Sequence, residues 1–262
     1  HMALDFLSRR AFMDAYDQDI PLGYGYASEP QTGRLLELSA RLRASFMTRR
    51  AKRDVLADLP PLSVELVEID TAATRAAVKA EKLLDLDVSG FSTSTPIDGA
   101  VSTVRREMGE AKAKPAIGFI RDLIEGGDRV FVLAHHKTVI EQLCGALDAQ
   151  DLTGSTPMKQ RQPIVDRFAS GHGNALVAQM NVGGLGLDGL QAACSVVVIV
   201  EPSWVPGDND QGIDRLFRVG QEFPVRAYML AAPGSIDERI VTRVVQKART
   251  ITGALDSVIL AV

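Results

Sequence analysis

Two arginines in the last quarter of the chain, Arg215 and Arg218, stand within residues 211–221, which read QGIDRLFRVGQ. Helical periodicity in this stretch predicts that both guanidinium groups lie on one face of a helix. Two permanently charged forks side by side suit a polyphosphate. The alternative is a solvated basic helix face, which is the usual meaning of an isolated Arg-x-x-Arg pair.

A glycine-rich stretch, NVGGLGLDG at residues 181–189, offers a second chemical signal. Gly184, Gly186 and Gly189 form a GxGxxG pattern after an apolar run, as in dinucleotide-binding loops. Only residues 190–194 separate them from the next apolar run, whereas a crossover between parallel strands needs about a dozen residues. The stretch is better interpreted as a loop whose backbone N–H groups approach a phosphate, with a plain tight turn at Gly183–Gly184 as the alternative.

A third signal is the turn Gly154-Ser155-Thr156 before Pro157. Its hydroxyls are expected to cap a following helix in which Pro157 takes the first position. Hydroxyls at a helix N-terminus also suit a nucleic-acid phosphate, so both interpretations stay open. Arg161 on that helix is expected to pair with Asp166 or with phosphate.

The string at residues 211–221 resembles motif six of the Swi/Snf family of DNA translocases, Gln-Ala-x-Asp-Arg-x-His-Arg-Ile-Gly-Gln. Further stretches resemble the family in the same order: residues 46–61 (FMTRRAKRDVLADLPP), 129–136 (RVFVLAHH), 152–168 (LTGSTPMKQRQPIVDRF), 175–191 (motif five), 201–206 (EPSWVP) and 234–240 (GSIDERI). Residues 105–124 resemble the annealing-helicase branch, and the nearest relatives are expected in its bacterial or phage members.

The resemblance implies the second RecA-like lobe of a superfamily-two motor that moves along double-stranded DNA. Arg215 and Arg218 would be catalytic arginine fingers for ATP, which the full-length protein would bind with Mg²⁺. The implied nucleotide-binding residues are Gly184, Gly186, Asp188, Gln211 and Asp214. The implied contacts with the DNA backbone are Lys137, Gly154, Ser155, Thr156, Arg161 and Asn181.

Two groups that a complete motor needs are absent from the sequence. No GxxxxGK followed by Ser or Thr occurs, and Asp-Glu occurs only at Asp237-Glu238, in the expected exit helix. We therefore expect the chain to bind no cofactor tightly by itself and to need a first lobe as its partner. Four departures from the family pattern bear on the mechanism: Phe217 for His, Gly212 for Ala, Gln179-Met180 for Ser-Thr, and Glu201 for Asp.

From residue 129 onward, short β-branched runs alternate with amphipathic stretches, which predicts an α/β fold with a parallel central sheet and helices on both faces. Strands are expected at 130–133, 175–178, 195–200 and 225–230, and helices at 139–149, 158–169, 208–219 and 236–251. Earlier residues suggest irregular structure at 3–38, a basic helix at 39–58, a strand at 63–69, and helices at 71–86 and 100–125 with a break near Pro115. This organisation predicts a linker and helical segment over residues 1–70, a helical extension over 71–128, and the RecA-like lobe over 129–262.

The composition limits the kinds of partner and the functional classes that fit this chain. The net charge of −4 gives no global attraction to DNA, so contacts must be local. No run of 18 apolar residues occurs, so we expect no membrane partner and a cytoplasmic protein, with Cys144 and Cys194 as buried free thiols or, alternatively, a disulfide. His135, His136 and Cys144 lack further ligands at useful spacing, so no metal site is expected. The competing functions are a degenerate lobe that acts as an interaction module and a small-molecule α/β enzyme, for which no nucleophile or acid–base pair is evident.

Overall fold

The computed structural model describes residues 9–22, 25–30, 34–45, 59–83, 99–183, 188–203, 206–235, 237–239 and 241. The chain divides into two units, one made of residues 1–57 with 244–262 and the other of residues 58–243. The functional motifs lie in the second, larger unit.

The small unit contains regular elements where irregular structure was expected. Helix α1 (Arg9–Tyr16) leads into an antiparallel hairpin of β1 (Asp17–Leu22) and β2 (Gly25–Pro30), and α2 (Leu35–Ser45) follows. Arg34 joins these elements, because its Nη1 donates to the carbonyl of Ala15 at 2.8 Å and its guanidinium lies 5.2 Å from the ring centre of Tyr16. Of the basic helix expected over 39–58, α2 covers the first part, and residues 46–58 lie outside the described chain.

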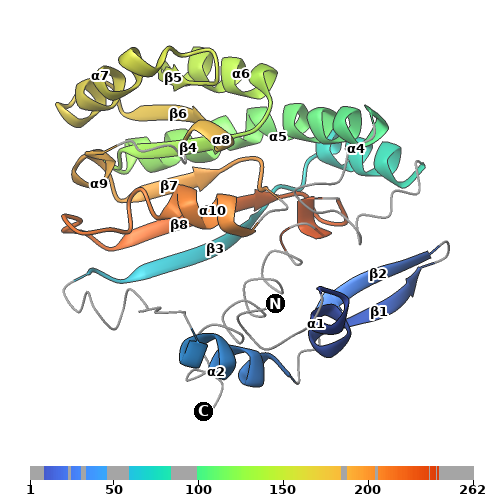
Figure 1. The fold of residues 1–262 in the computed structure, drawn as a ribbon. Helices are drawn as coiled ribbons and strands as arrows, with labels where there is room; N and C mark the ends of the chain where they lie inside the picture. Colours follow the sequence, from blue (N-terminus) through green and yellow to red (C-terminus); the bar gives the residue numbers. More distant parts are fainter. Residues whose placement is uncertain are drawn as a thin grey trace. The chain divides into compact units, whose positions relative to one another are not determined.

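A six-stranded, all-parallel sheet forms the centre of the large unit (Figure 1). Its strands are β3 (Leu62–Glu68), β4 (Val130–Ala134), β5 (Gln150–Leu152), β6 (Ala175–Gln179), β7 (Val196–Ile199) and β8 (Val225–Ala231). They lie in the order β3-β8-β7-β4-β6-β5. The four strands expected after residue 129 all form, because their apolar runs are buried on both faces of the sheet.

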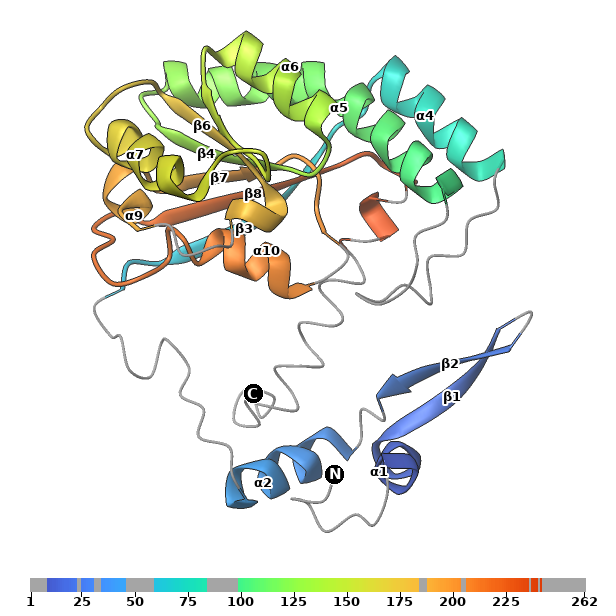
Figure 2. The same cartoon turned by 45° about the horizontal axis from the view of Figure 1, so that its top comes forward.

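Helices cover the two faces of this sheet (Figure 2). Alternation along β4 shows the division: Val130 and Val132 pack with α5 (Gly99–Glu125) and α6 (Lys137–Leu147), whereas Phe131 and Leu133 pack toward the opposite layer. That layer consists of α7 (Met158–Ala169), α9 (Leu190–Ala193) and α10 (Pro206–Ile213), and the short α8 (Met180–Gly183) follows β6. Helix α4 (Ala72–Leu83) packs beside α5. The expected three-layer α/β arrangement is confirmed.

Two elements before residue 129 are integral to this unit. β3 pairs with β8 from Leu62↔Val225 onward, and α5 supplies Ala113, Ala116 and Ile120 to the core. The compact unit therefore begins at residue 58 rather than at the expected lobe boundary of 129. The break expected near Pro115 is wrong, since α5 runs unbroken from Gly99 to Glu125. The helix ends where Gly127 takes a φ of 94° and residues 126–128 donate to carbonyls of its last turn.

Candidate nucleotide and nucleic-acid interface

The predicted DNA-binding residues follow neighbouring strands at one edge of the sheet. All six strands run in the same direction, so the loops that follow β4, β5, β6, β7 and β8 leave from the carboxyl edge. Parallel α/β sheets bind ligands outside this edge. The topology therefore gathers segments that are up to a hundred residues apart in sequence.

The Gly154-Ser155-Thr156 turn follows β5 and is closed by its own hydroxyls. The N–H of Thr153 donates to Oγ1 of Thr156 at 3.0 Å, and the Oγ atoms of Thr153 and Ser155 lie 2.8 Å apart. The predicted helix cap is wrong, because α7 begins at Met158, Pro157 occupies the N-cap position, and no side chain caps the helix. Thr156 closes the turn instead of capping α7. Gly154 and Ser155 remain exposed, where a phosphate could reach them.

Arg161 stabilises the same turn from α7. Its Nε donates to the carbonyl of Thr156 at 3.0 Å, and only 9% of the residue is exposed. The alternative partner expected for it, Asp166, accepts instead from the side-chain amide of Gln162 at 2.8 Å. Lys137 opens α6 after β4 and is exposed, and the backbone of Asn181 lies in α8 after β6.

Gln179, the last residue of β6, joins two strand ends. Its Oε1 accepts from the N–H of Gly154 at 3.0 Å, and its Nε2 donates to the carbonyl of His135 at 3.2 Å. Sequence reasoning noted Gln179 only as a departure from the family's Ser-Thr. The bridge was not predictable from local sequence, because both partners are distant along the chain.

Glu201, after β7, lies at the centre of a buried polar cluster. Its Oε2 accepts from the N–H groups of His135 and His136 at 2.8 and 2.9 Å, and its Oε1 lies 2.6 Å from Nδ1 of His136. Burial raises the pKa of Glu201, but the hydrogen bond and charge of His136, its backbone N–H and the charge of Lys112 outweigh it, so the pKa is lowered. For His135, burial first, then the charges of Arg105 and His136, lower the pKa. The carboxylate thus fixes the backbone that follows β4.

Lys112 is the largest fully buried side chain among the described residues and lies behind this edge. From α5 it donates to the carbonyls of Val200 and Leu230, the latter at 3.0 Å, and forms an ion pair with Asp237. Asp237 belongs to the GSIDERI motif and is itself buried. Lys112 therefore ties α5 to the ends of β7 and β8 and to the start of the exit segment.

Asp188 and Arg218, both predicted to serve the nucleotide, are brought together. Nη1 of Arg218 lies 3.3 Å from Oδ1 of Asp188, with 39% and 70% of the two side chains exposed. Gln162 on α7 brackets the backbone of Asp188, donating to its carbonyl at 2.8 Å and accepting from its N–H at 3.3 Å. Gly184 and Gly186, expected beside them, lie outside the described residues.

The helix predicted to carry the two arginines ends before them. α10 stops at Ile213, and Arg215 and Leu216 donate to carbonyls three residues back, which forms turns through residues 214–220. The expectation of one continuous helix over 208–219 is therefore wrong. Gln211 is exposed at the end of α10, and Asp214 is exposed in the turn. Burial first, and then the charge of Arg218, lower the pKa of the half-buried Arg215, while Asp214 opposes this.

Gln221 explains why the turns are ordered. Its Nε2 donates to the carbonyls of Cys194 and Leu216 at 3.0 and 3.3 Å, and its Oε1 accepts from the N–H groups of Glu222 and Phe223. The side-chain amide of Gln221 thus makes four hydrogen bonds, and one of them holds this segment against the loop before β7. These bonds favour the turns over a continuation of α10.

Comparisons with known proteins agree with this arrangement. Residues 115–220 match the family described as helicase conserved C-terminal domain. The C-terminal part of the Fun30 ATPase domain has a similar structure, with a TM-score of 0.54 and 16% identity over 71% of this chain and 89% of that one. The fold is RecA-like, as predicted.

Curated proteins supply the sequence relationship. The SWI/SNF-related matrix-associated actin-dependent regulator of chromatin subfamily A-like protein 1 of Xenopus tropicalis is 28% identical over 89% of this chain and 25% of its own length. The DNA annealing helicase and endonuclease ZRANB3 of Mus musculus is 28% identical over 82% and 21%. DNA repair and recombination protein RAD54B of Homo sapiens is 36% identical over 37% and 10%.

The larger unit is similar to the C-terminal lobe of Swi/Snf-related helicases. The chain spans about a quarter of the length of the curated relatives that it matches over most of its own length. Two departures of this lobe from the family pattern have a local packing explanation. Phe217 packs against the core beneath α7 and α10, and Gly212 lets α10 approach β4, because an added Cβ would lie 2.4 Å from Cδ1 of Leu133.

The sequence also gave expectations about the cysteines, metal binding and membrane spans. Cys144 and Cys194 are free thiols, half-buried and buried respectively, and burial raises the pKa of each to about 12. Within the described residues, no group of three or more His, Cys, Asp or Glu side chains could hold a metal ion. A search of the same residues finds no helix that is long and apolar enough to span a membrane.

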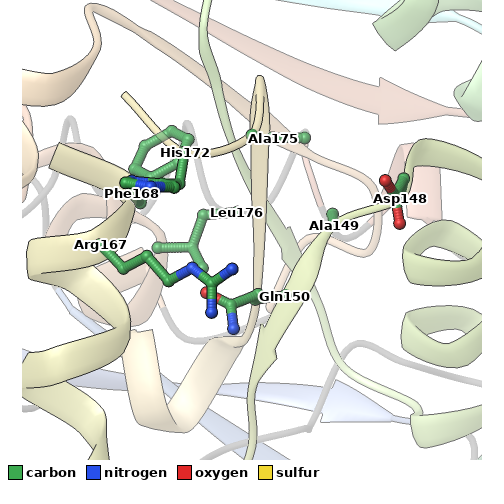
Figure 3. A pocket seen from close by; sticks show the side chains of 9 residues that line it. Asp148, Ala149, Gln150, Arg167, Phe168, His172, Ala175 and Leu176 are labelled. Atoms are coloured by element: carbon green, nitrogen blue, oxygen red, sulfur yellow. The ribbon is translucent and has the colours of Figure 1, made fainter. Parts of the chain in front are cut away.

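A pocket of about 310 Å³ lies at the opposite edge of the sheet, where β5 and β6 begin (Figure 3). In Figure 3 the side chain of Arg167 extends toward Gln150, and Asp148 lies on the far side. None of the predicted site residues lines this pocket. The candidate DNA contacts after β4, β5 and β6 therefore lie at the carboxyl edge, whereas Asp188 and the turns with Arg215 and Arg218 lie in the segments that precede β7 and β8.

Proposed function

We propose that this lobe is one half of an ATP-driven translocase on double-stranded DNA. ATP and Mg²⁺ would be held by a first lobe, and Arg215 and Arg218 would reach the terminal phosphates to stabilise the charge that develops during phosphoryl transfer. Gln211, Asp214, Asp188 and the glycines Gly184 and Gly186 would border the nucleotide. The pairing of Arg218 with Asp188 at 3.3 Å carries this proposal, because it brings together two residues predicted to serve the nucleotide, one from the glycine-rich stretch and one from residues 211–221.

The DNA contact would be made by the turn after β5. Exposed Gly154 and Ser155, with Thr156 positioned by Arg161, present hydroxyl and backbone groups that suit phosphates. Lys137 and Asn181 follow the neighbouring strands β4 and β6 and would extend the same contact. These groups read no bases, so binding should be independent of sequence and should weaken with added salt.

Within the family, we propose an annealing-helicase-like role in a bacterial or phage protein of the cytoplasm. Its support is the resemblance of residues 105–124 and the similarity to a protein named as a DNA annealing helicase. Reannealing of a plasmid bubble by the full-length protein tests this role.

The decisive experiment uses the full-length protein with both lobes. Arg215→Ala and Arg218→Ala should each lower DNA-stimulated ATP turnover by roughly 10³-fold, with nucleotide binding modestly affected, because the arginines act in the transition state. Arg218→Lys should fail as well, since a point charge cannot replace the fork. Arg167→Ala, which removes an exposed arginine that lines the pocket where β5 and β6 begin, is the matched control and should keep full turnover.

Near-normal turnover in both alanine variants would refute the arginine assignment. If turnover was also absent from the wild type while DNA binding persisted, the lobe would be the non-catalytic interaction module that the sequence left as an alternative.

A further inference from the structure

A row of hydrogen bonds crosses the carboxyl edge in the spatial order of the strands. Gln179, at the end of β6, accepts from the N–H of Gly154 after β5 and donates to the carbonyl of His135 after β4. Glu201, after β7, accepts from the N–H groups of His135 and His136. The row thus links the ends of β5, β6, β4 and β7, which are successive neighbours in the sheet.

The hydrogen bonds of this row hold its side chains in one orientation. A glutamine amide has one acceptor and one donor end, and here each end meets a complementary backbone group, which fixes the amide orientation. Glu201 is 3% exposed and its carboxylate accepts three hydrogen bonds. Short charge-assisted bonds in a buried setting resist displacement more strongly than surface contacts do.

The two ends of the row lead to different parts of the interface. One end is the turn at Gly154. The other end continues from Glu201 to Ser203, whose N–H donates to Oδ1 of Asn209 at 3.0 Å and whose carbonyl accepts from Nδ2 of Asn209 at 2.7 Å. Asn209 lies in α10, and the turns that follow α10 carry Arg215 and Arg218.

We propose that Gln179 is a positioning residue that holds the DNA-facing turn in register with the segment that carries the arginines. This inference rests on the proposed function and extends it. It names the side chain through which DNA bound at Gly154 affects the arginines that act on ATP. A serine or threonine hydroxyl, the family's usual choice, is too short to span the same two strand ends. Gln179 therefore makes this coupling in a way that is particular to this chain.

The test measures the ratio of ATP turnover with saturating duplex DNA to turnover without DNA, in the full-length protein. Gln179→Leu keeps the size of the side chain and removes both bonds, so the ratio should fall about tenfold. Gln179→Glu keeps only the acceptor and should give an intermediate ratio. Gln142→Leu, the same change at an exposed position of α6, should leave the ratio unchanged.

A second readout separates positioning from plain destabilisation. Partial unfolding lowers ATP turnover with and without DNA by the same factor and leaves their ratio unchanged. If the turn at Gly154 is no longer held in position relative to the arginines, the ratio falls. Hydrogen exchange at the N–H of Gly154 should become faster in Gln179→Leu while exchange within β4 stays slow.

The outcomes distinguish the two proposals. If DNA does not stimulate the wild type, the proposed function fails, whatever Gln179 does. If DNA stimulates the wild type and Gln179→Leu keeps the same ratio, the inference about Gln179 is wrong and the proposed function stands. Should Gln179→Leu unfold, the near-isosteric Gln179→Glu decides, and an unchanged ratio in that variant overturns the inference.

Discussion

Gly109 is the position where one added methyl group should damage the lobe most clearly. It is buried in α5 where the helix passes the carboxylate of Glu201, and an added Cβ would lie 2.3 Å from Oε1 of Glu201, 2.8 Å from its Cδ and 3.1 Å from Cγ2 of Val139. The carboxylate cannot retreat freely, because it is hydrogen-bonded to His135 and His136. Gly109→Ala must therefore displace Glu201 or the helix.

The expected loss of stability follows from these contacts. Overpacking a tight core costs about 1–3 kcal/mol, and weakening a hydrogen bond to a charged group costs about 1.5–3 kcal/mol. Alanine in a helix returns about 0.5–1 kcal/mol relative to glycine. We expect a net loss of about 3 kcal/mol, which for a unit of this size lowers Tm by roughly 6–12 °C.

Denaturant and thermal unfolding of Gly109→Ala measure this loss. Gly118→Ala is the matched control, since Gly118 is exposed in the same helix and an added Cβ meets nothing within 4 Å, so this variant should gain about 0.5–1 kcal/mol. Combining Gly109→Ala with Glu201→Asp, which shortens the carboxylate arm, should restore part of the loss. Equal stability of Gly109→Ala and Gly118→Ala would refute the packing argument.

Two further predictions concern buried charge. Lys112→Met leaves the buried Asp237 carboxylate without its cation, so the free energy of unfolding should fall by about 3–5 kcal/mol, and by less when Asp237→Leu is added. An unchanged denaturation midpoint in Lys112→Met would show that this ion pair contributes nothing. Glu201, whose pKa is lowered on folding, contributes stability that is present above the pKa of the unfolded chain and is lost as pH falls through its lower folded pKa. Stability should therefore fall below about pH 4.5 more steeply in the wild type than in Glu201→Gln, and parallel profiles from about pH 6 to pH 3 would contradict this assignment.

The sequence predicted the four strands after residue 129, because β-branched runs such as residues 196–199 are typical of buried parallel strands when helices alternate with them. It did not predict where α10 ends. Local periodicity favours helix through Arg218, but the amide of Gln221 binds the carbonyls of Cys194 and Leu216 and closes the segment into turns.

The same limit applies to the polar cluster behind the interface. Lys112 meets the carbonyl of Val200 and Glu201 meets the N–H groups of His135 and His136, all far apart in sequence, and no local pattern signals such pairs. The substitution of Glu for the family's Asp at residue 201 was a visible signal, but its meaning depends on the gap that Gly109 leaves for the longer side chain. Gln179 is a similar case. The sequence shows a long amide side chain where the family has a short hydroxyl, but not which groups the amide would bind.

The position of β3 has a consequence for how the lobe is made. β3 is the first strand of the large unit along the chain, yet its partner in the sheet is β8, the last strand, with Leu62 opposite Val225. During synthesis the β4–β7 segments can pair among themselves as they emerge, while β3 has no partner until β8 is complete. Until then its apolar residues Leu62, Val64 and Leu66 lack even the strand beside them, and they stay 37%, 54% and 48% exposed in the finished sheet. The nascent chain thus carries an unpaired, aggregation-prone strand while the whole β4–β7 segment is translated, and the pairing of β3 with β8 is the step that ends this exposure.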